Sequence, residues 1–121
     1  MKKTMLQLTA ALLLCGTAGS AFAADCKVTV GVVMELTGPA GEYGQAGAKS
    51  VEMAFRDINE AGGVNGCDLV TDTRDSQSTG NVAVDAATQL VQVKKVPAII
   101  GGIISSVTIP ILTSVTAPAK I

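Results

Sequence analysis

The fold is decided by residues 27–66, which read KVTVGVVMELTGPAGEYGQAGAKSVEMAFRDINEAGGVNG. They open with an apolar, β-branched run at 28–33, which predicts a strand. Within residues 36–47, glycine recurs at every third position from Gly38 to Gly47, which predicts a long loop after that strand. The remainder is amphipathic and predicts a helix, and Gly62-Gly63 supplies the left-handed backbone that commonly ends one.

The predicted helix has one apolar side. Its apolar residues recur with the 3.6-residue period of an α-helix, and charged residues fall on the opposite side. We therefore expect a buried stripe that consists of Gly47, Val51, Ala54, Phe55 and Ile58.

A second strand and a second helix follow along the chain. The strand is predicted at 68–72, and a polar run leads from it to a helix that Ser78 or Thr79 caps. Lys94-Lys95 are expected in the last turn of this helix, where cations favour the helix dipole. Its buried side is predicted to include Ala83, Ala86, Ala87 and Leu90.

A third strand is predicted at 97–100. It is a short apolar run bounded by proline and by Gly101-Gly102, which is typical of a fully buried parallel strand. Residues 108–119 are rich in β-branched side chains, which favour a strand. We assign them to a helix, because a cap at Ser106 or Thr108 would place Pro110 in the first turn, where proline is tolerated.

This β-α-β-α-β-α order predicts an α/β fold, a parallel sheet in three layers. Ligands of such sheets bind beyond the carboxyl ends of the strands, which corresponds here to residues 36–47, 73–78 and 102–106. The sequence ends where a fourth strand is expected. We therefore expect residues 24–121 to be an incomplete lobe with an uncovered sheet edge, which would behave poorly alone.

Residues 1–23 have the pattern of a signal peptide. Lys2-Lys3 precede an apolar run, and Ala21-Phe22-Ala23 fits a cleavage site. The run is too short for a membrane anchor, so we expect export to the periplasm with cleavage near Ala23. A lipid anchor on Cys15 is the alternative, which Leu14 disfavours because a small residue should precede a lipidated cysteine.

Composition excludes several classes of function. After residue 23 the chain has seven basic and ten acidic residues, a net charge of −3, and few aromatic side chains. These numbers argue against nucleic-acid binding. The chain has no histidine, which removes the commonest metal ligand and general base. The glycine spacing at 41–50 departs from the phosphate loop, so we expect no nucleotide, metal or other cofactor.

Cys26 and Cys67 remain after the predicted cleavage. An even number of cysteines in an oxidising compartment favours a disulfide. If the strands that follow them are parallel neighbours, both cysteines lie at the same edge of the sheet. The alternative is that both are simply small buried residues.

Five polar or aromatic positions are candidates for ligand contact. Ser105-Ser106 follow the third strand, where hydroxyls and free N–H groups form an uncharged cradle for a carboxylate; the alternative is an ordinary serine N-cap. Tyr43 lies in the loop that faces them and either covers the apolar part of a ligand or simply packs within the loop. Asp72 and Asp75 are expected to be solvated loop residues, with contact to a ligand ammonium or acid–base catalysis as alternatives.

Together these segments resemble the periplasmic leucine/isoleucine/valine-binding proteins, the substrate-binding components of branched-chain amino-acid ABC importers. The resemblance covers nearly all of residues 24–121. It rests on Val30-Gly31-Val32-Val33, Leu36-Thr37-Gly38-Pro39, Tyr43-Gly44, Asp57-Ile58-Asn59, Ala61-Gly62-Gly63-Val64-Asn65-Gly66 and Ile99 through Ser106.

The resemblance implies a non-enzymatic protein with a two-lobed type I periplasmic binding fold that closes over its ligand. Ser105 would hold the α-carboxylate of an amino acid, supported by Ser106 and Thr108, and Tyr43 would line the ligand. An inner-membrane permease is the implied partner, and the full-length protein is expected to be a monomer. Alternatives are a sensory or regulatory protein of the same fold, or a ligand that is an amide, urea or an aromatic acid.

Overall fold

The computed structural model describes residues 26–121, so the predicted signal peptide and Cys15 lie outside the described residues. Strands and helices alternate, as predicted. The three strands are β1 (Lys27–Met34), β2 (Asp68–Asp75) and β3 (Ile99–Gly101). The helices are α1 (Gly41–Glu60), α2 (Gly80–Thr88), α3 (Ser105–Ile111) and α4 (Ala117–Ala119), with the π-helical turns η1 (Gln89–Val93) and η2 (Leu112–Thr116) between them.

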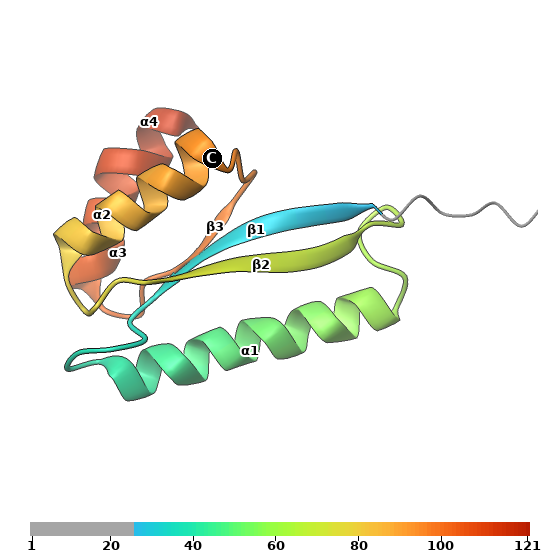
Figure 1. Cartoon of the computed structure of the whole chain (residues 1–121), viewed down its shortest axis with the longest axis horizontal. Coiled ribbons are helices and arrows are strands. Elements are labelled where there is room, and N and C mark those ends of the chain that lie inside the picture. The colour runs from blue at the N-terminus through green and yellow to red at the C-terminus, as the bar shows by residue number, and fades with distance from the viewer. Residues whose placement is uncertain (1–25) are drawn as a thin grey trace, which may run out of the picture.

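The three strands form one parallel sheet in the order β2-β1-β3. Helix α1 lies on one face of the sheet, and α2 packs with α3 and α4 on the other face (Figure 1). This arrangement confirms the predicted three-layer α/β class. No helix among residues 26–121 is long and apolar enough to cross a membrane.

The main core lies between β1 and the helices α2 and α3. Leu90 and Val107 are fully buried there with Val33 of β1. Gly31 faces the same core, where an added Cβ would lie 3.0 Å from Leu90 Cδ1. The predicted buried residues Ala83, Ala87 and Leu90 are confirmed, while Ala86 is only partly buried.

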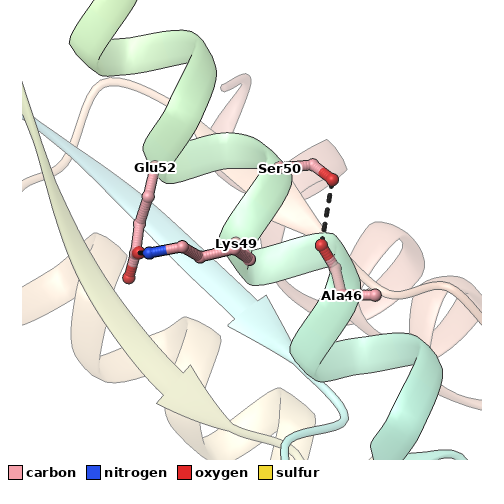
Figure 2. A network of polar contacts seen from close by, with 4 residues as sticks. All are labelled: Ala46, Lys49, Ser50 and Glu52. Carbon is pink, nitrogen blue, oxygen red and sulfur yellow. Dashed lines mark hydrogen bonds and ion pairs between the residues drawn. The ribbon is translucent and has the colours of Figure 1, made fainter.

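Helix α1 covers its sheet face incompletely. Of the predicted apolar stripe, Phe55 is buried and Gly47 and Val51 are half-buried, but Ala54 and Ile58 are exposed. The stripe is therefore wider than the three-stranded sheet can cover. The outward face of α1 has surface contacts, such as Lys49 Nζ to Glu52 Oε2 at 3.0 Å and Ser50 Oγ to the Ala46 carbonyl at 2.9 Å (Figure 2).

Several predicted boundaries are wrong. Residues 41–47 belong to α1 and not to a loop, because Gly44 and Gly47 serve close packing and not a turn. Strand β3 lies at the edge of the sheet, and Ile100 is 37% exposed, so β3 is not fully buried.

The helix ends also differ from the predictions. Thr79 occupies the N-cap of α2 without a side-chain cap bond, and the helical segment ends before Lys94, so neither lysine lies in its last turn. Helix α3 begins at Ser105 with Ile104 as N-cap, which leaves Pro110 beyond the first turn.

Candidate ligand-binding site

The predicted site segments lie together at one rim of the molecule. Strands β1, β2 and β3 are parallel, so their carboxyl ends meet there, and α1 and α3 both begin at this rim (Figure 1). The loop before α3 packs against α1, because a Cβ added to Gly47 would lie 2.8 Å from Ile103 Cδ1. Tyr43, one turn before Gly47 on α1, therefore lies on the same rim as Ser105.

The hydrogen-bond donors at the start of α3 are divided into two groups. The Ile103 and Ile104 N–H groups donate to the carboxylate of Glu35. The Val107 and Thr108 N–H groups donate to the Ile104 carbonyl at 3.0 Å each. The two residues between these groups, Ser105 and Ser106, are exposed, and their N–H and hydroxyl groups have no hydrogen-bond partner within residues 26–121.

The other two predicted contact residues differ in their surroundings. Tyr43 is 68% exposed in the first turn of α1. The Thr108 hydroxyl faces its own loop, where it is 2.8 Å from the Gly102 carbonyl and 3.1 Å from the Ile104 carbonyl. Thr108 therefore braces the loop that carries the serines, while Tyr43 and the serines remain accessible.

Asp75, at the end of β2, organises the loop between β1 and α1. Its Oδ1 accepts the N–H groups of Leu36, Thr37 and Gln77, and its Oδ2 accepts the Thr37 hydroxyl at 2.6 Å. Burial raises the pKa of Asp75, but the hydrogen bonds from the Thr37 hydroxyl and the three N–H groups outweigh it. The pKa of this carboxyl consequently lies below its ordinary value of 3.8.

Neither aspartate near β2 is a solvated loop residue without partners. Asp72 lies within β2, and its Oδ1 accepts a hydrogen bond from Arg74 Nε at 2.7 Å. Asp75 is committed to the β1–α1 loop. The expectation of two solvated loop residues is therefore wrong, because both carboxylates accept hydrogen bonds from other residues of the fold.

Two residues of the rim were not predicted from the sequence. Glu35 is fully buried at the end of β1, and a charged residue directly after a buried apolar strand was a signal for it. Ser78 was considered only as a helix cap, but its Oγ accepts the Ala40 N–H and donates to the Thr37 carbonyl.

A disulfide joins Cys26 and Cys67 at the opposite end of the sheet, with their Cα atoms 4.6 Å apart. The cysteines precede the adjacent parallel strands β1 and β2, which is the arrangement that pairing requires.

Two other features of residues 26–121 bear on where a ligand or ion could bind. A cavity of about 470 Å³ lies between α1 and β2, with Phe55 and Leu69 in its wall, and neither Ser105 nor Ser106 lines it. Within residues 26–121 no group of three His, Cys, Asp or Glu side chains could hold a metal ion. Ser105 and Ser106 together form an exposed surface of neutral hydrogen-bond donors, which suits an anionic group of a small molecule.

Comparison with known proteins identifies the class. The family model for periplasmic binding proteins matches residues 27–121, and the chain belongs to this family. These are ligand-binding proteins, so the alternative of an exported enzyme that uses Asp72 or Asp75 is not upheld.

Similarity to individual curated proteins confirms the resemblance to the leucine/isoleucine/valine-binding proteins. The chain is 32% identical over 106 residues to Leu/Ile/Val-binding protein homolog 3 of Brucella melitensis biotype 1, covering 88% of this chain and 28% of that protein. It is 34% identical over 97 residues to BasB of Halobacterium salinarum, a chemotactic signal transduction system substrate-binding protein, covering 78% of this chain and 23% of that one. The chain thus spans about a quarter of the length of these curated relatives.

A solved structure supports the fold. The branched-chain amino acid transporter substrate-binding protein LivJ from Streptococcus pneumoniae, in complex with isoleucine, superposes with a TM-score of 0.75 at 28% sequence identity. The superposition covers 78% of this chain and 27% of LivJ.

Proposed function

We propose that this chain forms the N-terminal lobe of a substrate-binding protein for an ABC importer of branched-chain or related amino acids. Residues 1–23 would direct it to the periplasm and be removed, and residues 24–121 would form part of a two-lobed protein, monomeric at full length. The loaded protein would deliver its ligand to an inner-membrane permease.

The observation that carries this proposal is the pair of serines at the start of α3. Ser105 and Ser106 present hydroxyl and N–H donors that no group within residues 26–121 accepts. The α-carboxylate of the ligand would accept these donors at Ser105, with Ser106 beside it. Thr108 supports the contact by holding the loop, and Tyr43 would cover the apolar part of the ligand. Closure of a second lobe would exclude water and strengthen these bonds.

A sensory protein of the same fold is the second candidate. The similarity to BasB, named as part of a chemotactic signal transduction system, favours it specifically. Both candidates would bind the ligand at the same rim, and they differ in the partner protein that binds the closed, ligand-loaded conformation. Co-purification with a permease or with a chemotaxis transducer would distinguish them.

Titration calorimetry of the full-length protein with isoleucine and leucine tests the proposed site. Loss of a hydrogen bond to a charged group costs about 1.5–3 kcal/mol, so Ser105→Ala should raise the Kd roughly tenfold or more. Ser50→Ala is the matched control, because the Ser50 hydroxyl is exposed on α1 and bonds only to its own helix (Figure 2). Equal affinity of the parent and Ser105→Ala proteins would contradict the assigned role, and tighter binding of an amide, urea or an aromatic acid would change the ligand class.

A further inference from the structure

The most deeply buried charged side chain among residues 26–121 is Glu35, which has no exposed surface. It is not paired with a cation: within this range, its carboxylate accepts hydrogen bonds only from backbone N–H groups. Oε1 accepts from Ile103 at 3.1 Å and Ile104 at 3.3 Å, and Oε2 accepts from Ile103 at 3.2 Å. Burying a carboxylate is costly unless it is well bonded, so this arrangement requires the loop before α3 to hold one conformation.

Glu35 connects the two walls of the proposed site. Its backbone touches α1, because a Cβ added to Gly44 would overlap the Glu35 carbonyl and lie 2.7 Å from the Glu35 nitrogen. Its side chain reaches the amides directly before Ser105. Glu35 therefore contacts both the loop that carries Ser105 and the turn of α1 that carries Tyr43.

We propose that Glu35 is a positioning residue for ligand binding: its carboxylate holds the Ile103 and Ile104 amides so that the Ser105 hydroxyl and N–H face the ligand. This inference rests on the function proposed above. By accepting both amides itself, Glu35 also leaves Ser105 and Ser106 as the donors available at the start of α3. The reach of the side chain matters here, because an acceptor oxygen must span from β1 to the loop.

Two variants separate the effect of the length of the Glu35 side chain from the effect of its negative charge. Glu35→Asp keeps the charge but shortens the side chain by one methylene, which withdraws the acceptor from the amides. Glu35→Gln keeps the length. Its carbonyl oxygen can take the place of Oε1, which accepts both N–H groups, and its NH2 group replaces only Oε2, the second acceptor of the Ile103 N–H. Glu52→Gln is the control, because it also removes one negative charge, from a side chain that is 54% exposed on α1 (Figure 2).

Isoleucine affinity and amide hydrogen exchange are measured on each full-length protein. We expect Glu35→Asp to raise the Kd about tenfold and to speed exchange at Ile103 and Ile104, while Glu35→Gln stays within about threefold of the parent and Glu52→Gln is unchanged. A Glu35→Asp protein with parental affinity, or with parental exchange at both amides, overturns the proposal. If the parent binds no amino acid, the proposed function fails, whereas the exchange measurement still decides whether Glu35 holds the loop.

Discussion

Asp75→Asn should destabilise the protein in a way that depends on pH. In the parent, Oδ1 accepts three N–H groups and Oδ2 accepts the Thr37 hydroxyl. Asparagine keeps one carbonyl oxygen in place of Oδ1, and the Thr37 hydroxyl can turn to accept from the new amide. The variant therefore loses the charge assistance of these bonds more than the bonds themselves. Charge-assisted bonds are roughly twice as strong as neutral ones, so the expected loss at pH 7 is about 2 kcal/mol.

The sign of the pH dependence follows from the lowered pKa of Asp75. A carboxyl whose pKa is lower in the folded than in the unfolded protein contributes stability above its unfolded pKa. This contribution is lost as the pH falls below the ordinary value of 3.8 towards the lower folded pKa. The difference in stability between parent and variant should therefore be constant from about pH 7 to pH 5 and shrink below about pH 4.

Urea unfolding followed by circular dichroism at several pH values measures this difference. Asp85→Asn is the control, because Asp85 is exposed on α2 and its side chain forms no hydrogen bond or ion pair with residues 26–121. Equal stability of parent and Asp75→Asn at pH 7, or a difference that persists undiminished at pH 3, would refute the reasoning. Either result would mean that the loop between β1 and α1 is held by other contacts.

Two further predictions concern packing and covalent structure. Gly44→Ala should lower the free energy of unfolding by about 3 kcal/mol, because the new Cβ overlaps the Glu35 backbone. Gly41→Ala is the control and should be nearly neutral, since its Cβ would lie 3.4 Å from the nearest atom, the Leu36 oxygen. Similar urea midpoints for the two variants would disprove the close approach of α1 to Glu35. Cys26→Ser should cost about 4 kcal/mol relative to the oxidised parent, because the bridge closes a loop across 41 residues; an unchanged melting temperature under oxidising conditions would count against the bridge.

Local sequence patterns predicted most of the fold. The β-branched run of β1, the glycine pair after α1 and the alanines of α2 each have a local signal, and the positive φ angles of Gly62 and Gly63 match the predicted helix stop. Glycine has two uses, however, and the spacing at 38–47 does not separate them. Gly38 has a positive φ and serves a turn, whereas Gly44 is needed because α1 crosses close to the Glu35 backbone.

The candidate site was predicted only in part, because its support comes from distant contacts. The position of Ser105 and Tyr43 in the proposed site follows from the rule that ligands bind at the carboxyl ends of parallel strands. The roles of Glu35 and Asp75 depend on partners 68 and 38 residues away in the sequence, which no local pattern specifies. The edge position of β3 likewise depends on strand order, which its apolar composition does not reveal.

Asn59, near the end of α1, has a consequence for how the sheet can grow. Its side-chain amide donates to the Leu69 carbonyl at 2.9 Å and accepts the Leu69 N–H at 2.7 Å. This pair of bonds imitates a neighbouring strand at one residue, so the outer border of β2 is already occupied there. Within residues 26–121 no side chain hydrogen-bonds the backbone of β3 from Ile99 to Gly101. Asn59 therefore disfavours pairing of an additional strand with β2 at this residue, whereas the edge at β3 remains available for such pairing.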